Sequence, residues 1–162
     1  MRGPALVIGI GNADRGDDAV GLCVVRRLAG WALPGVVVEE AGGDALALIE
    51  RWNGMRHVVL VDASEPAGAP GRIRRLDATA VALPRDVGLS STHAFGLVEA
   101  VELARTLGCL PEWRVVYAIE AGGLTAGAGL APAVAASVEP AASRIAAELA
   151  AAQAAGEEAG HA

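Results

Sequence analysis

The sequence contains no lysine, and all 13 of its basic residues are arginines. The absence of lysine excludes a Schiff-base lysine, a serine-lysine dyad and a phosphate-loop lysine. The net charge of −6 argues against the basic face that a nucleic-acid-binding protein needs. We therefore expect no nucleic-acid partner and look for chemistry among the carboxylates and histidines.

Long hydrophobic runs are also missing. No segment reaches the roughly 20 apolar residues of a membrane-spanning helix, and the first residues lack the pattern of a secretory leader. The sequence thus predicts a cytoplasmic protein with no membrane partner. Its two cysteines, Cys23 and Cys109, form no Cys-x-x-Cys pair and lie in or beside helical patterns, which favours buried, reduced thiols over a disulfide.

Aromatic residues are scarce, at 3% of the 162 residues, whereas hydrophobic residues make up 53%. The core must therefore consist mainly of alanine, valine, leucine and isoleucine. A chain of this length has room for one domain, which would bury about 70% of its unfolded surface. We predict a single domain over residues 1–152, followed by a frayed tail of small and polar residues at 153–162.

Apolar, β-branched runs alternate with helical patterns along the chain. This order is typical of a three-layer α/β fold, with a twisted, mainly parallel sheet of about five strands and helices on both faces. The run at 57–61 suits a central strand, Gly30 is expected to end the first helix, and Pro140 to kink or break the last. The predicted strands cover 6–10, 36–40, 57–61, 72–76 and 115–119. The predicted helices cover 19–29, the residues after an N-cap at Asp44 to about 52, the residues after possible N-caps at 90–93 to about 107, and the residues from 132 onward.

The opening stretch, residues 7–21, combines an apolar strand, a glycine-marked turn and the adjacent carboxylates of Asp17 and Asp18. Either carboxylate can simply cap the helix that follows. Capping explains one aspartate better than two, however, and Asp14 adds a third acid nearby. Because open α/β sheets bind ligands at the carboxyl ends of their strands, the acid cluster favours a cation or a positively charged substrate at this turn.

Three side chains occupy the places where such a sheet collects its ligands. Asp18 follows the first strand, Asp62 follows the third, and His93 stands at the start of a helix. Two carboxylate oxygens and one imidazole nitrogen suit a divalent metal of the zinc or nickel type. Each also has a structural interpretation, as a helix-start acid, a turn-forming aspartate and a cap-region histidine respectively. Their joint position is what favours a site.

Two other kinds of site are weaker. Ser90 and Ser91 lie near His93, but no Gly-x-Ser-x-Gly elbow exists to present a serine nucleophile. Gly9 and Gly11 begin like a dinucleotide-binding fingerprint, with acids at 39 and 40 in the place of a ribose-binding acid. The next position of that fingerprint is an aspartate rather than a glycine and would repel a pyrophosphate.

The motifs together resemble the hydrogenase maturation endopeptidases. The likeness runs from about residue 6 to about residue 149, and its most specific part is Gly-Ile-Gly-Asn at 9–12 followed by Gly-Asp-Asp-Ala-Val-Gly at 16–21. Four further motifs support it. They are Val-Asp-Ala at 61–63, Ser-Thr-His at 91–93 with Gly-Leu at 96–97, Gly-Leu-Ala-Pro at 129–132 and Val-Glu-Pro at 138–140.

This resemblance implies a peptidase that removes the C-terminal extension of a nickel-iron hydrogenase large-subunit precursor. It implies that the catalytic and metal-contacting residues are Asp18, Asp62 and His93. Nickel, supplied by the precursor, would be the metal, although another divalent ion would suit the same ligands. Metal contact would then orient only a nickel-loaded precursor for cleavage.

Three further residues are candidates for binding the substrate. Gly42 and Gly43 would let an extended tail pass close to the backbone, and Glu120 ends the last predicted strand on the same rim. All three also have ordinary structural interpretations in loops. Two competing functions remain at this point: a nickel-dependent checkpoint that binds the precursor without cutting it, and a nucleotide-binding α/β domain.

Overall fold

The centre of the protein is a twisted five-stranded sheet in the order β2-β1-β3-β5-β4. In the computed structural model, which describes residues 5–42, 44–79, 97–125, 127 and 129–160, four strands are parallel and the edge strand β4 is antiparallel to β5. The predicted α/β fold with a mainly parallel sheet is therefore confirmed. The strands are β1 (Ala5–Ile10), β2 (Val36–Ala41), β3 (His57–Ser64), β4 (Ile73–Asp77) and β5 (Trp113–Glu120).

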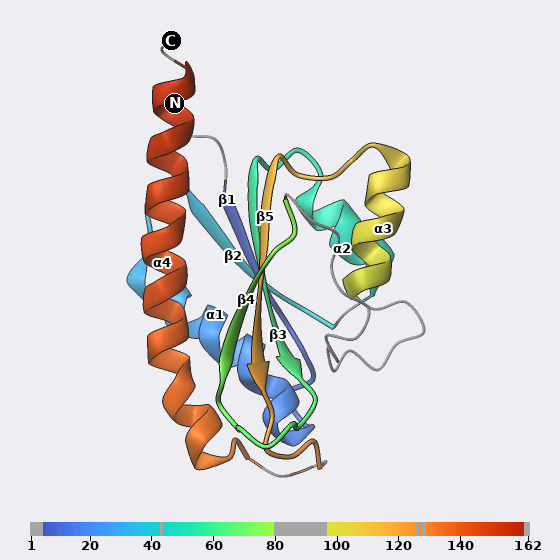
Figure 1. The fold of residues 1–162 in the computed structure, drawn as a ribbon, viewed down its shortest axis with the longest axis vertical. Coiled ribbons are helices and arrows are strands. Elements are labelled where there is room, and N and C mark those ends of the chain that lie inside the picture. Colours follow the sequence, from blue (N-terminus) through green and yellow to red (C-terminus); the bar gives the residue numbers. More distant parts are fainter. Residues whose placement is uncertain (1–4, 43, 80–96, 126, 128, 161–162) are drawn as a thin grey trace.

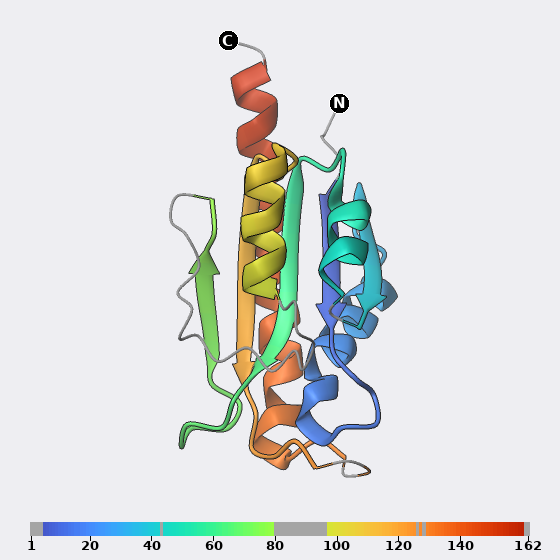
Figure 2. The ribbon, with the colours of Figure 1, turned by 90° about the vertical axis from the view of Figure 1, so that its right-hand side faces the viewer.

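Helices cover both faces of the sheet (Figure 1). On one face lie α1 (Val20–Trp31) and α4 (Pro132–Gly160), and on the other lie α2 (Ala45–Trp52) and α3 (Leu97–Leu107), which gives three layers (Figure 2). Alternate strand residues enter the two cores, so Val7 packs toward α1 while its neighbour Ile8 packs toward α2. None of the described helices is both long and apolar enough to cross a membrane.

The sheet changes its winding direction at β1. The chain goes from β1 to β2 on one side, and then returns to place β3 on the other side of β1. Connections that leave two neighbouring strands in opposite directions open a crevice at their carboxyl ends, where sheets of this kind bind ligands. The fold thus identifies the ends of β1 and β3 as the place to look for a site.

Two glycines let α1 approach this part of the sheet closely. A Cβ on Gly9 of β1 would lie 2.4 Å from the carbonyl oxygen of Gly21 in α1, and a Cβ on Gly21 would lie 2.4 Å from that of Val61 in β3. Such distances are far inside van der Waals contact. A larger residue at either position would push the helix away from both strands.

The structure differs from the sequence-based expectations in the helices. Gly30 does not end α1, which continues to Trp31 and stops where Ala32 takes a left-handed conformation with φ 48°. Of the two effects expected of Pro140, a kink or a break, the break does not occur, because α4 runs on through this residue. The helix also continues past Gln153, the expected start of the frayed tail, to Gly160, and Gln153 itself is buried. Packing of α4 against α1 and the sheet outweighs these local signals.

Candidate active site

Asp62 lies inside β3, because the strand continues to Ser64 instead of ending at the predicted residue 61, and it pairs with Ala118 of β5. Its side chain is completely buried. One oxygen, Oδ1, accepts a hydrogen bond from the backbone N–H of Ala63 at 2.8 Å. The other, Oδ2, has no partner among the described residues. A buried carboxylate oxygen without a partner is costly, so Asp62 is poorly explained by a structural role.

The electrostatics of Asp62 lead to the same conclusion. Burial, and secondly the negative charge of Asp18, raise the pKa of Asp62 well above its ordinary value, although the hydrogen bond from Ala63 opposes this shift. The two carboxylates are therefore close enough to interact. Strong perturbation by burial and a like charge is characteristic of functional sites, although structural clusters show it too.

Asp18 reaches the crevice from a short 3-10 helix, Gly16–Ala19, which connects β1 to α1. It is buried, and its Oδ2 accepts a hydrogen bond from the backbone N–H of Asn12 at 3.1 Å. Position 11 must be a glycine, because a Cβ on Gly11 would lie only 2.0 Å from the carbonyl oxygen of Asp18. The turn after β1 thus wraps closely around Asp18.

The adjacent carboxylate of Asp17 has a different role. Its oxygens accept hydrogen bonds from the backbone N–H groups of Gly122 at 2.7 Å, Gly123 at 2.9 Å and Ala131 at 2.7 Å. The N-cap residues of the 3-10 helix and of α1 are Arg15 and Ala19, and neither makes a side-chain cap hydrogen bond. The carboxylate of Asp17 thus bonds to a distant loop and not to the helix that follows it. Nothing in the local sequence pattern indicates this tertiary role of Asp17, because its amide partners lie more than 100 residues away.

Glu120, a predicted substrate-binding residue, ends β5 as expected and is buried. Its Oε2 accepts hydrogen bonds from the backbone N–H groups of Ala67 at 3.2 Å and Ala69 at 2.5 Å. It therefore holds the loop that leads from β3 to β4. Gly42, also predicted to bind substrate, is exposed, and a Cβ there would meet nothing within 4 Å. There is thus open space beside the backbone at the carboxyl end of β2.

Two predicted site residues, His93 and Gly43, lie outside the described residues. Within those residues no group of three or more metal-ligating side chains comes together. What the structure does bring together is Asp18 and Asp62, the other two members of the predicted metal set. The assignment of His93 to that set remains a prediction.

The acids that suggested a nucleotide site are engaged in surface ion pairs. Glu39 pairs with Arg51 at 3.1 Å, and Glu40 pairs with Arg26 at 2.7 Å. All four side chains are at least one-third exposed. These contacts give both acids an ordinary role at the edge strand β2, which weakens the ribose-binding interpretation.

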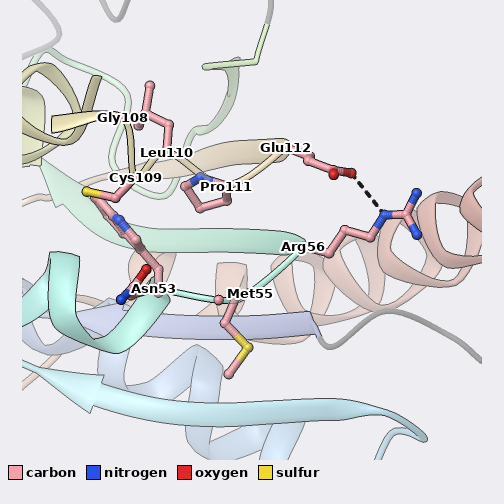
Figure 3. Close-up of a pocket in the computed structure, with 10 residues that line it drawn as sticks. Asn53, Met55, Arg56, Gly108, Cys109, Leu110, Pro111 and Glu112 are labelled. Atoms are coloured by element: carbon pink, nitrogen blue, oxygen red, sulfur yellow. Dashed lines mark hydrogen bonds and ion pairs between the residues drawn. The ribbon is translucent and has the colours of Figure 1, made fainter. Parts of the chain in front are cut away.

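A hollow of about 500 Å³ lies at the opposite, amino end of the sheet, where the end of α2 meets the connection from α3 to β5 (Figure 3). Arg56 and Glu112 form an ion pair of 3.0 Å beside it, and the partly buried thiol of Cys109 lies on another side (Figure 3). It contains no member of the predicted site. The hollow is therefore separate from the crevice at Asp18 and Asp62.

Comparison with known proteins gives one consistent result. Residues 23–148 match the model of the family described as hydrogenase maturation protease. The chain is 31% identical over 144 residues to the hydrogenase 2 maturation protease of Escherichia coli strain K12, with 86% of this chain and 87% of that protein covered.

Solved structures agree in fold. The hydrogenase maturating endopeptidase HybD from E. coli matches with a TM-score of 0.77 and 25% identity, covering 92% of this chain and 93% of that chain. The NiFe hydrogenase maturation protease HybD from Thermococcus kodakarensis matches with a TM-score of 0.73 and 27% identity, covering 90% and 98%. With this fold, an acidic pair in its crevice and these relatives, the chain belongs to the hydrogenase maturation protease family, whose members are endopeptidases.

Proposed function

We propose that the protein removes the C-terminal extension of a nickel-loaded nickel-iron hydrogenase large-subunit precursor in the cytoplasm. The observation that carries the proposal is the completely buried Asp62, whose Oδ2 has no partner among the described residues and whose carboxyl group interacts with that of Asp18. Membership of the maturation protease family supplies the reaction class, hydrolysis of a peptide bond.

The four buried carboxylates around the crevice divide by what they bind. Asp17 accepts three backbone N–H groups and Glu120 accepts two, which is how a carboxylate stabilises a loop. Asp62 accepts one backbone N–H group, and its carboxyl group interacts with the charge of Asp18. A divalent cation would compensate the like charges of Asp18 and Asp62 and use the free oxygen of Asp62.

Nickel fits this donor set. It accepts carboxylate and imidazole ligands, and two carboxylates with His93 provide both. In the proposal the nickel belongs to the precursor, and Asp18, Asp62 and His93 contact it when the precursor docks. A precursor without metal would leave the Oδ2 oxygen of Asp62 without a cation, so it would bind less well. This dependence would restrict cleavage to precursors that have received their nickel.

The extension would lie along the same rim. The open space beside Gly42 leaves room for an extended chain, and we assign Gly42, Gly43 and Glu120 to contacts with it. For Glu120 the assignment rests on its place at the end of β5, next to the loop that its carboxylate holds.

Intact mass spectrometry of the precursor tests the proposal. The nickel-loaded and nickel-free precursors from the same source would be incubated with the protein and with Asp18→Asn, Asp62→Asn and His93→Ala variants. Loss of one C-terminal peptide is expected only with the nickel-loaded precursor and the unaltered protein. Glu112→Gln is the matched control, because it changes an exposed acid at the opposite end of the sheet, and it should cleave normally.

The alternatives predict other masses. The nickel-loaded precursor could keep its mass and co-elute with the protein on size exclusion. That result would contradict the protease function and favour the non-cleaving checkpoint. Equal cleavage of the nickel-loaded and nickel-free precursors would show that the protein is an endopeptidase whose activity does not depend on nickel. Normal cleavage by Asp62→Asn would show that the acidic pair is not the site.

A further inference from the structure

The turn that carries Asp18 is attached to the connection between β5 and α4, here called the wall loop (121–125, 127 and 129–131). The backbone N–H of Asp17 donates to the Gly123 carbonyl at 3.0 Å, and the N–H of Gly127 donates to the Asp14 carbonyl at 2.8 Å. The side chain of Asp17 adds its three bonds from Gly122, Gly123 and Ala131. Two segments far apart in the sequence are therefore bound into one unit.

Asp17 is the centre of this unit. It is 1% exposed, and both of its carboxylate oxygens are used by the wall loop. The contact leaves little spare room, because a Cβ on Gly16 would lie 3.0 Å from the Gly123 carbonyl oxygen. Charge-assisted bonds of this kind are stronger than neutral ones, so Asp17 is the strongest single attachment between the turn and the loop.

The wall loop also borders the crevice on its other side. Ala121 donates to the carbonyl of Ser64 at the end of β3, two residues beyond Asp62. Asp17 therefore connects the backbone next to Asp18 with the loop that is fixed beside Asp62. The bonds of Asp17 therefore lie on the path that connects the two candidate carboxylates.

We infer that Asp17 is a positioning residue for peptide cleavage: through the wall loop it fixes Asp18 relative to Asp62. This inference rests on the proposed peptidase function. Asp17 touches no reacting group itself, since its oxygens are occupied by backbone amides. Misplacement of a reacting group by about 1 Å can reduce the rate by about 100-fold. Loss of the Asp17 bonds should therefore lower kcat more than it changes KM.

The test compares precursor cleavage by Asp17→Asn with that by the unaltered protein, at a temperature well below both melting transitions. Asparagine keeps the shape but replaces one acceptor oxygen by a donor group, so at least one of the three amides loses its partner. We expect kcat to fall by about 10- to 100-fold with little change in KM. Faster hydrogen exchange at the Gly122, Gly123 and Ala131 amides, measured by NMR, should accompany it.

Two further variants separate positioning from loss of stability. Thr79→Ala removes the side-chain hydrogen bonds to the backbone of Arg114 at the amino end of β5, far from the crevice, and should lower the melting temperature without lowering kcat. Gly122→Ala crowds Asp17 Oδ2, which a new Cβ would approach to 3.3 Å, and should lower kcat less than Asp17→Asn does. Gly122→Ala keeps the inference testable if Asp17→Asn does not fold.

Three outcomes would overturn the inference. They are an unchanged kcat in folded Asp17→Asn, a rise in KM alone, and an equal loss of kcat in Thr79→Ala. If Asp17→Asn does not fold, an unchanged kcat in Gly122→Ala has the same meaning. Absence of cleavage by the unaltered protein would instead contradict the proposed function, and the two failures are therefore distinguishable.

Discussion

Gly21 in α1 lies directly against the carbonyl oxygen of Val61 in β3, so that a Cβ on Gly21 would be only 2.4 Å from that oxygen and 2.7 Å from the Ile10 carbonyl oxygen. Backbone atoms of two strands cannot move aside as a flexible side chain can. This contact holds the start of α1, and with it the turn that carries Asp18, over the ends of β1 and β3.

Gly21→Ala is therefore expected to destabilise the protein by about 1–3 kcal/mol or more, although alanine favours helices. Urea unfolding followed by circular dichroism measures this change. Gly30→Ala is the matched control in the same helix, because a Cβ there meets nothing within 4 Å, and it should stabilise by about 0.5–1 kcal/mol. Equal effects of the two substitutions would contradict the close contact.

Asp62→Asn should make the protein more stable at neutral pH while it abolishes cleavage. Burial raises the pKa of Asp62 well above its ordinary value, so the favourable contribution of the protonated carboxyl is complete at low pH and is lost as pH rises through the raised pKa. The amide that replaces this carboxyl carries no charge and avoids that loss.

Thermal unfolding in the presence of a chelator tests this prediction. The melting temperature of Asp62→Asn should exceed that of the unaltered protein at pH 7 by about 2–4 °C for each kcal/mol gained. The difference should shrink as the pH approaches about 4, the ordinary aspartate pKa. A variant that is less stable than the unaltered protein at pH 7 would show that the Asp62 carboxylate has a compensating partner.

His57, at the start of β3, is expected to remain neutral in the folded protein. Its side chain is buried and meets the ring of Trp113 edge-on at 5.8 Å. Burial, and secondly the charge of Arg56, lower the pKa of His57 below 6.5, and Glu112 opposes the shift. As pH decreases, His57 is therefore protonated at a higher pH in the unfolded chain than in the folded protein. The free energy of unfolding should consequently fall as pH decreases below about 6.5.

NMR titration of the His57 ring and urea unfolding between about pH 7 and pH 5 measure the two effects. In His57→Phe, which keeps a ring against Trp113, the slope of stability against pH should decrease. A ring that titrates at or above the ordinary histidine pKa would refute the prediction.

Pro140 lies on the exposed side of α4, within the helix. It lacks the N–H that would bond to the preceding turn, and its ring crowds that turn. Pro140→Ala should stabilise the protein by up to about 3 kcal/mol. Pro132→Ala, at the first residue of the same helix, should have little effect, because an N–H at that position has no partner in the helix. Chemical denaturation of the two variants checks this difference.

Much of the fold follows from the alternation of apolar runs and helical patterns. The run of apolar residues in β3 predicts a central strand, and Asp44 accepts N–H groups of Leu46 and Ala47 as a cap should. Local signals fail where packing opposes them. Gly30 lies inside α1 because the other residues of that helix pack on the core, and α4 retains Pro140 for the same reason.

The site is predictable to the extent that it follows from strand ends. Asp18 and Asp62 can be placed together because both come from the carboxyl edge of a parallel sheet. The loop-stabilising roles of Asp17 and Glu120 cannot be predicted in this way. Their partners are backbone amides, which every residue type but proline provides, so the sequence contains no signal for the pairing. His93, outside the described residues, stays a prediction.

The three tryptophans have a consequence for spectroscopy. Trp31 ends α1, Trp52 ends α2 and Trp113 begins β5, so all three indoles belong to the end of the molecule opposite Asp18 and Asp62. Intrinsic fluorescence will consequently report unfolding but remain nearly silent when a precursor docks. A fourth indole, introduced by Thr125→Trp in the wall loop, would supply an optical signal for that encounter.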